Sequence, residues 1–289
     1  MLHMAIKCAG KALHGSNWDR LVRFVARQDG LEYIGEPVDE TQDIGAALAT
    51  SLDVDVRVFS GSSVLDLSAE PTSNIRTIRC IGLNYRNHAK AMNLALPDHR
   101  TLLFKPATCL NAPNAPLVIP HQATDGQADY EAELAIVIAK HARNVRVEDA
   151  LDYVLGYTCS NDVTARKHQC SGAQWGFGKG FDGFAPIGPC LVSTRRVPDP
   201  RQVVQEGRAD DMIFTIPKII AYLSQGTTIE PGTVIMTGTP HGIGVSKNPP
   251  VFLKPVDDLR IVMSHGLRSL VNYVEYENMP EGGTTSAKL

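Results

Sequence analysis

Two carboxylates on an otherwise apolar strand constrain this chain more than any other feature of its sequence. Glu131 and Glu133 lie two positions apart in the run from Tyr130 to Lys140, whose other side chains fit a strand that is apolar on both faces. Residues two apart on a strand leave the same face, so two like charges would meet in a low-dielectric interior. A bound divalent cation, a shared proton or a strand end open to water would relieve that repulsion.

A third carboxylate and two cations follow downstream. Asp162 lies in the run Ser160 to Arg166, and Lys179 follows in Gly178-Lys179-Gly180. Carboxylate oxygens are ligands that Mg²⁺ prefers, and neighbouring Arg and Lys side chains suit an anionic substrate. Taken singly, each of these residues is more often a solvated surface charge. Together they predict a site for a small, oxygen-rich acid.

Composition excludes several classes of protein. The 289 residues carry 28 Lys and Arg against 31 Asp and Glu, a net charge of −3, so the basic excess of a nucleic-acid-binding protein is missing. No apolar run approaches the ~20 residues that span a bilayer, so we expect a soluble intracellular protein without a membrane partner. The six cysteines are scattered without a C-x-x-C pair, which indicates buried free thiols rather than disulfides.

The pattern of elements predicts a mixed α/β, mostly β architecture. The run 18–27 fits a strand or a helix, and 259–275 fits a hairpin that turns at His265-Gly266. Helices are expected at 148–157 and at 211–224. Other strands are expected at 31–34, 53–59, 76–85, 102–105, 130–140 and 233–237. We divide the chain into a small β-rich N-terminal segment (1–72), a catalytic domain (73–277) and a flexible tail (278–289).

Five sequence blocks occur in one order, and they resemble the fumarylacetoacetate hydrolase superfamily. The resemblance covers about residues 76–275. It rests on Gly82-Leu83-Asn84-Tyr85 with His88, Asp129-Tyr130-Glu131 with Glu133, Asn161-Asp162-Val163-Thr164-Ala165-Arg166, Gly178-Lys179 with Phe181-Asp182, and Thr237-Gly238-Thr239-Pro240 with Gly242. It implies a β-roll catalytic domain that forms a homodimer.

The resemblance also implies a role for each matching residue. The family metal, Mg²⁺ or Mn²⁺, would lie on Glu131, Glu133 and Asp162 and act as a Lewis acid on a 2-oxo acid or β-dicarbonyl substrate. The catalytic residues would be His88, which activates water, and Lys179, which stabilises enolate charge. The substrate-binding residues would be Tyr85, which with Asn84 shapes the pocket near His88, together with Arg166, Gln169 and Thr239.

Two departures from the family pattern qualify these expectations. In many members a Glu three residues after the His orients it, and here that residue is Ala91. An imidazole without a carboxylate partner loses its fixed tautomer, which weakens hydrolysis more than chemistry that needs only an electron sink. The second departure is a segment near 201–206 that is about a dozen residues shorter than in relatives, the length of a strand.

Three functions follow. The first is hydrolysis of a C–C bond in a small β-dicarbonyl or 2-oxo acid. The second is decarboxylation or keto–enol tautomerisation of an oxaloacetate-like substrate, which Ala91 favours. The third is a catalytically silent metal-binding member of the family, against which the retained Glu131, Glu133, Asp162 and Lys179 argue.

The last three residues bear on location. The chain ends in Ala287-Lys288-Leu289, which resembles the Ser-Lys-Leu peroxisomal address. An ordinary frayed terminus explains the same residues, so the expected location is cytoplasmic or peroxisomal.

Overall fold

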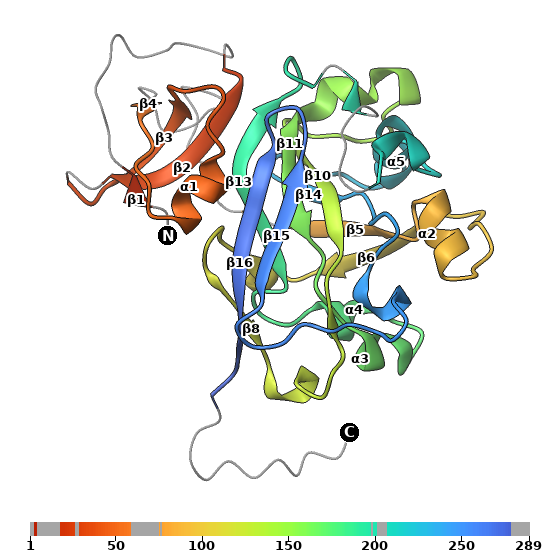
Figure 1. Cartoon of the computed structure of the whole chain (residues 1–289). Coiled ribbons are helices and arrows are strands. Elements are labelled where there is room, and N and C mark those ends of the chain that lie inside the picture. Colours follow the sequence, from red (N-terminus) through yellow and green to blue (C-terminus); the bar gives the residue numbers. More distant parts are fainter. Residues whose placement is uncertain are drawn as a thin grey trace.

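The protein is a mostly β fold with a few short helices at its edges, as the sequence predicts (Figure 1). The computed structural model describes residues 3–4, 18–26, 29–58, 75, 77–197, 199–200 and 207–278. The predicted boundary at residue 72, the shortened segment at 201–206 and the C-terminal Ala-Lys-Leu lie outside these ranges. Among the described residues, no helix is long and apolar enough to cross a membrane.

A large mixed sheet forms the centre of the molecule. Its main path runs in the order β4, β3, β2, β13, β11, β10, β14, β5, β6, while β1 pairs with β2 and β7 pairs with β13. The strands are β1 (His3–Met4), β2 (Arg20–Ala26), β3 (Glu32–Pro37), β4 (Val56–Val58), β5 (Ile78–Gly82), β6 (Thr101–Lys105), β7 (Leu110–Asn111), β10 (Ala132–Ile138), β11 (Val154–Asn161), β13 (Ala185–Ser193) and β14 (Val234–Met236).

The strands β15 (Asp258–Met263) and β16 (Arg268–Tyr276) form the predicted hairpin. A second sheet has the order β15, β16, β8, with β8 at Pro116–Ile119. A two-stranded ladder pairs β9 (Ala128–Asp129) with β12 (Thr164–Ala165) and lies next to the carboxylates of interest.

Short helices cover the ends of the sheet. The α-helices are α1 (Ile44–Ala49), α2 (Arg86–Ala91), α3 (Arg166–Cys170), α4 (Gly176–Lys179) and α5 (Ile216–Leu223). The 3₁₀ helices include η1 (Ala107–Cys109), η2 (His121–Ala123), η3 (Val147–Tyr153), η5 (Ala209–Asp211) and η6 (Gly244–Ser246). In Figure 1, α3 and α4 lie below the sheet, and α2 projects beside it beyond β5 and β6.

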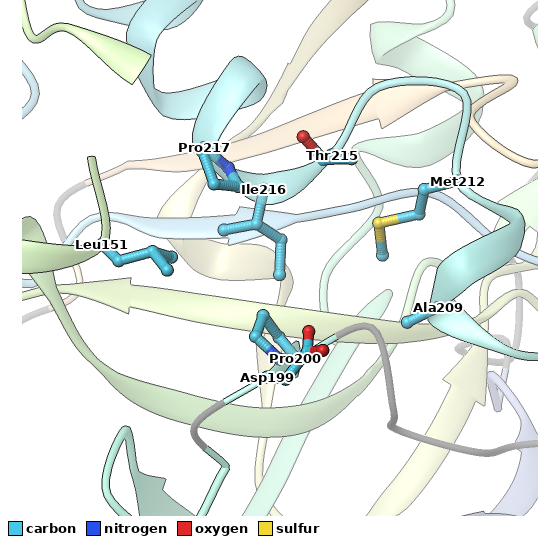
Figure 2. A pocket seen from close by; sticks show the side chains of 8 residues that line it. All are labelled: Leu151, Asp199, Pro200, Ala209, Met212, Thr215, Ile216 and Pro217. Atoms are coloured by element: carbon cyan, nitrogen blue, oxygen red, sulfur yellow. The ribbon is translucent and has the colours of Figure 1, made fainter. Parts of the chain in front are cut away.

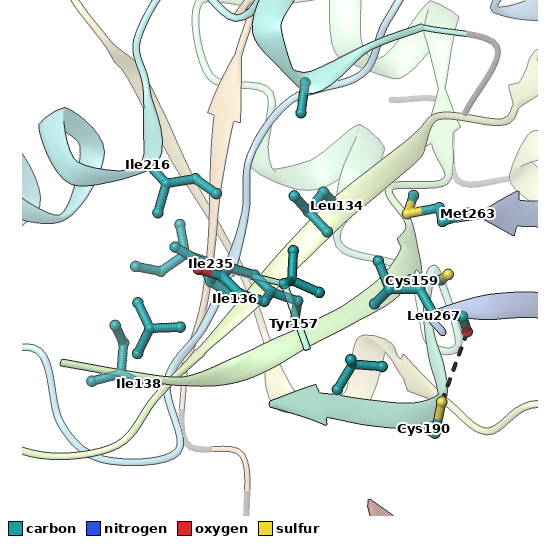
Figure 3. Close-up of a cluster of buried hydrophobic side chains, with 14 of the residues drawn as sticks. Leu134, Ile136, Ile138, Tyr157, Cys159, Cys190, Ile216, Ile235, Met263 and Leu267 are labelled. Atoms are coloured by element: carbon teal, nitrogen blue, oxygen red, sulfur yellow. Dashed lines mark hydrogen bonds between the residues drawn. The ribbon is translucent and has the colours of Figure 1, made fainter. Parts of the chain in front are cut away.

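The strand β10 is buried on both faces, as its composition predicts. Leu134, Ile136 and Ile138 pack into the apolar core shown in Figure 3, while Ala135 and Val137 contact a separate apolar cluster on the opposite face. Antiparallel pairing with β11 and β14 makes β10 a central strand. Glu133 therefore projects from the middle of the molecule.

The two predicted helices differ from the sequence-based expectation. Residues 148–157 begin as the 3₁₀ helix η3, but Val154 starts strand β11, because pairing with β10 and β13 buries this run in the sheet. The helix predicted at 211–224 begins only at Ile216. Pro217 lies in its first turn, and in the interior of a longer helix it would remove a hydrogen bond.

The remaining element predictions are confirmed, some with shorter and some with longer bounds. The ambiguous run 18–27 is the strand β2, and the runs 53–59 and 76–85 contain β4 and β5. The strand predicted at 130–140 starts at Ala132. Four of the five described cysteines are buried and all five are free thiols; Cys8 lies outside the described residues.

Candidate metal and substrate site

The three predicted metal ligands come together at one end of β10 and β11. Glu131 immediately precedes β10, Glu133 lies within it, and Asp162 follows the end of β11. Antiparallel pairing of the two strands places Ala132 opposite Asn161, and the Asp162 backbone N–H donates to the Glu131 carbonyl at 2.9 Å. One carboxylate oxygen from each of the three residues lies within 4.8 Å of the others, and all three side chains are buried.

Lys179 joins two of these carboxylates. Its Nζ donates to Glu131 Oε2 at 3.1 Å, to Asp162 Oδ2 at 2.7 Å and to Thr164 Oγ1 at 2.8 Å. Burial alone would lower the pKa of Lys179, but the charges of Asp162 and Glu131 raise it above its usual value. The buried ammonium therefore stays charged, in position to face developing negative charge.

Arg166 holds the other side of Glu131. Its Nη1 donates to Glu131 Oε1 at 2.6 Å and to Gln169 Oε1 at 3.1 Å, and its Nε donates to Asp129 Oδ2 at 2.8 Å. Asp129 also accepts the N–H groups of Gly244 and Val245. Arg166 and Gln169 are thus adjacent at the cluster, as expected, and Arg166 is held in place by two protein carboxylates.

Lys105 is a site residue that sequence reasoning missed. Its Nζ donates to Asp162 Oδ1 at 2.6 Å and to the carbonyls of Val163 and Phe184, and its side chain is fully buried. Lys105 lies in the run 102–105, which the sequence predicts to be a buried strand. Because buried lysines are almost always paired, this position could have indicated a buried ion pair. Its partners, however, lie 57 to 79 positions away.

Glu133 shows why the cluster suits a cation. Its Oε2 accepts the Gly238 N–H at 2.7 Å, and burial together with the charges of Asp162 and Glu131 raises its pKa well above the usual range. Gly238 approaches closely because its φ is +98° and a Cβ there would lie 2.7 Å from Asn84 Cβ. A metal ion would relieve the repulsion among these three carboxylates.

The charges of the site can be counted directly. Four carboxylates (Asp129, Glu131, Glu133, Asp162) face three cations (Lys105, Arg166, Lys179), which leaves a net charge of −1 when all are ionised. A divalent cation would bring the cluster to +1. The donor set, with only carboxylate oxygens, fits a hard cation such as Mg²⁺ or Mn²⁺.

His88 lies on the short helix α2 and has a different environment. Its imidazole is buried, and its Nδ1 has no hydrogen-bond partner among the residues that the structure describes. Burial lowers the pKa of His88, an effect larger than the opposing influence of the Glu131 charge. Ala91, one turn further along α2, is exposed and offers no carboxylate, so the neutral imidazole is favoured here.

The other predicted contacts are distributed around the cluster. Thr239 Oγ1 donates to the Ala132 carbonyl at 3.1 Å, directly beside the carboxylates. Tyr85 is fully buried in the apolar core. Asn84 is a structural residue, because its amide donates to the Thr237 carbonyl and exchanges hydrogen bonds with Phe214.

A cavity of about 380 Å³ lies elsewhere, beside α5 (Figure 2). Its lining is mostly apolar and includes none of the predicted site residues. The lining residues are Leu151, Asp199, Pro200, Ala209, Met212, Thr215, Ile216 and Pro217. This cavity is therefore separate from the carboxylate cluster.

Comparison with known proteins finds a matching family and similar enzymes. Residues 77–275 match the family described as fumarylacetoacetate (FAA) hydrolase, C-terminal. The chain is 42% identical over 281 residues to the caffeoylpyruvate hydrolase of Neonothopanus nambi, an alignment that covers 91% of this chain and 95% of that protein. It is 39% identical over 223 residues to the mitochondrial oxaloacetate tautomerase fahd2 of Xenopus laevis, covering 73% and 69% of the two chains.

A solved structure extends the likeness to the fold. The fumarylacetoacetate hydrolase from psychrophilic Exiguobacterium antarcticum superposes with a TM-score of 0.69 at 31% identity, covering 90% of this chain and all of that one. The sequence matches and the fold match thus point to one family. The chain belongs to the fumarylacetoacetate hydrolase family, and it is an enzyme of that family.

Proposed function

We propose that this enzyme is a divalent-metal-dependent hydrolase of acylpyruvates, small 2-oxo acids with a β-dicarbonyl group. The observation that carries the proposal is the buried cluster of Glu131, Glu133 and Asp162 bridged by Lys179. The N. nambi caffeoylpyruvate hydrolase, which matches nearly the whole chain, supports this class of substrate. A cluster that gains net positive charge with its metal suits a carboxylate substrate.

The residues would divide the work as follows. Glu131, Glu133 and Asp162 would hold Mg²⁺ or Mn²⁺, which when bound supplies Lewis acidity to adjacent substrate oxygens. Arg166 and Gln169 would orient the substrate carboxylate, and Thr239 would contact the other end of the substrate. Tyr85 would shape the wall behind His88.

The hydrolysis itself needs one proton acceptor and one charge stabiliser. His88, neutral because it is buried, would take a proton from water as the water oxygen bonds to the acyl carbonyl carbon. The C–C bond then breaks, and its electron pair becomes the enolate of pyruvate beside the Lys179 ammonium. Return of the proton to the enolate carbon gives pyruvate and a carboxylic acid.

Keto–enol tautomerisation of an oxaloacetate-like acid is the second candidate. The unpartnered Nδ1 of His88 and the exposed Ala91 favour it, because tautomerisation needs no activated water. The X. laevis relative is named an oxaloacetate tautomerase. Decarboxylation of the same substrate would use the same electron sink.

A product assay separates these activities. Metal-free enzyme would be supplied with Mg²⁺ or Mn²⁺ and given acetylpyruvate, an aryl-substituted acylpyruvate or the enol form of oxaloacetate. We expect two acids from the acylpyruvates and no turnover in EDTA. Release of CO₂, or exchange of enol for ketone without cleavage, would instead identify the second candidate. Full activity in EDTA would contradict both.

We also propose a homodimer that lies in the cytoplasm or in peroxisomes. The dimer is supported by the family resemblance and the location by Ala287-Lys288-Leu289. Light scattering of the purified protein would test the first. For the second, the location of a tagged chain would be compared with that of a chain lacking the last three residues.

A further inference from the structure

The helix that carries His88 is too short to hold itself in place. α2 has six residues, and isolated helices shorter than about 12 residues are marginal in water. Its N-cap residue is Tyr85, whose side chain makes no capping hydrogen bond, and its first turn contains no acidic residue. The N-cap position therefore lacks the Ser, Thr, Asp or Asn that normally satisfies the free N–H groups at a helix start.

An aspartate from a distant part of the chain supplies the missing cap. Asp211 Oδ2 accepts the backbone N–H of Asn87, the second residue of α2, at 2.9 Å. The two residues are 124 positions apart. N-cap side chains bond the N–H of the second or third helical residue, so Asp211 occupies the role of a cap from another segment. Its negative charge also faces the positive end of the helix dipole.

The contact is reciprocal. Arg86, the first residue of α2, donates from Nη1 to the carbonyls of Asp211 and Met212 at 3.2 and 2.6 Å. Just before the helix, the Asn84 carbonyl accepts the Ile213 N–H at 2.7 Å. The residues at and just before the start of α2 thus both donate hydrogen bonds to the segment 211–214 and accept hydrogen bonds from it.

We call the segment 86–100, which carries His88, the His88 arm. Its C-terminal end contacts the same part of the molecule as its start. After α2 the chain continues to Arg100, whose guanidinium lies 4.3 Å from the ring centre of Phe214 and 5.0 Å from that of Tyr222. The segment 86–100, which carries His88, is therefore held at both ends by residues 211–222.

We propose that Asp211 is a positioning residue for His88. It acts by capping α2 and so fixing the imidazole relative to the carboxylate cluster, while it makes no contact with Glu131, Glu133 or Asp162 among the hydrogen bonds and ion pairs of the described residues. The inference rests on the proposed function only in that His88 takes part in catalysis. The position of the imidazole can be measured without substrate.

Three variants separate positioning from general stability. Asp211→Ala removes the acceptor, Asp211→Asn keeps an acceptor oxygen, and Asp210→Ala changes the neighbouring residue of the same turn, which pairs only with Arg208 in the described structure. We expect Asp211→Ala to lower kcat about fivefold to tenfold, as for a lost N-cap bond, with KM and the Mg²⁺ affinity unchanged. Asp211→Asn should recover kcat to within about twofold, and Asp210→Ala should match the wild type.

A spectroscopic measurement makes the result independent of the reaction. In metal-free protein labelled with ¹⁵N-histidine, the His88 imidazole signals are identified by their absence in His88→Asn. They should move in Asp211→Ala and stay in place in Asp210→Ala. Unmoved signals in Asp211→Ala, an Asp211→Asn variant as impaired as Asp211→Ala, or an equal loss of metal affinity would overturn the proposal. Absence of turnover in the wild type would contradict the proposed function and leave the imidazole measurement intact.

Discussion

The carboxylate cluster and the His88 arm are built in opposite ways. The cluster lies at the ends of the central strands β10 and β11, and Glu131 and Asp162 each use both carboxylate oxygens in hydrogen bonds to cationic side chains. The His88 arm contains only one short helix, the six-residue α2. The Nδ1 atom of its imidazole has no hydrogen-bond partner among the described residues. The sheet thus fixes the groups that we propose stabilise charge, whereas a peripheral helix fixes the group that we propose moves protons.

Because the two parts of the site are built differently, we expect substitutions in them to affect different activities. A change in the cluster should remove every activity, because hydrolysis, decarboxylation and tautomerisation all need the same electron sink. A change in the arm should alter the balance between hydrolysis and the other two reactions.

The largest effect is expected from Glu133→Gln. The substitution keeps the shape and an acceptor for the Gly238 N–H but removes one ligand charge. Because loss of a residue that merely supports a metal ligand already costs 10- to 100-fold in affinity, we expect the Mg²⁺ affinity to fall by more than about 100-fold. Acylpyruvate cleavage and enol turnover should fall together.

Isothermal titration with Mg²⁺ measures the first effect, and the two product assays measure the second. The control is Glu148→Gln, since Glu148 is an exposed carboxylate on η3. Wild-type metal affinity in Glu133→Gln would remove Glu133 from the ligand set, and loss of only one activity would contradict the shared electron sink.

The second prediction concerns stability and compares two lysines. Lys105 is fully buried against Asp162, whereas Lys167 forms an exposed ion pair with Asp125. Lys105→Met leaves a buried carboxylate oxygen without its partner, so the free energy of unfolding should fall by about 3–5 kcal/mol. Lys167→Met should change it by less than about 1 kcal/mol.

Urea unfolding of the metal-free variants measures both values under the same conditions. Equal losses of unfolding free energy in the two variants would show that the buried Lys105–Asp162 pair contributes no more to stability than the exposed Lys167–Asp125 pair. They would also weaken the view of the cluster as the rigid half of the site.

The residues of the cluster could be named from the sequence because each lies in a short motif. Apolar side chains on both faces of the run 130–140 identified a strand buried on both sides, and the resemblance implied that Asp162 and Lys179 lie beside Glu131. The hairpin of β15 and β16 was also predicted from the sequence. The strand and the hairpin depend on residues close in sequence, whereas Lys179 lies 48 positions from Glu131 and was placed beside it through the family resemblance.

The residues that hold the site in place could not be predicted from the sequence, because they lie in segments distant from the residues they contact. Lys105 meets Asp162 across 57 residues, and Asp211 caps α2 across 124. The strand β11 begins where apolar spacing predicted a helix, since pairing with β10 and β13 decides its conformation. In contrast, Pro217 was a local signal for the start of α5 and was overlooked.

The third prediction changes the arm by giving His88 a carboxylate. Ala91 lies one turn after His88 on α2 and is exposed, so Ala91→Glu places a carboxylate three residues away on the same face. A partner for Nδ1 would stabilise the imidazolium formed when water is activated. We expect acetylpyruvate hydrolysis to rise by up to about tenfold, a fraction of what general acid–base catalysis contributes.

Enol turnover and decarboxylation of oxaloacetate should change by less than about twofold, because they need no activated water. Lys90→Glu is the matched control, since it adds the same side chain at a position that does not face His88. A parallel rise of all three activities in Ala91→Glu would contradict the division between arm and cluster.

The smallest effect is the pH dependence of stability that His88 confers. Burial lowers the pKa of His88 in the folded protein, so the unfolded chain binds a proton at higher pH than the folded one. The stability that results is fully present above the unfolded pKa of about 6.5 and is lost as the pH falls through the folded pKa. Urea unfolding of metal-free protein should therefore show a wild-type stability that falls more steeply below pH 6.5 than that of His88→Asn. A difference between the two proteins that stays constant from pH 5 to pH 8 would mean that the imidazole of the arm is as accessible to protons as that of an unfolded chain. The arm would then be open to solvent, and the contrast with the buried cluster would be greater than the structure indicates.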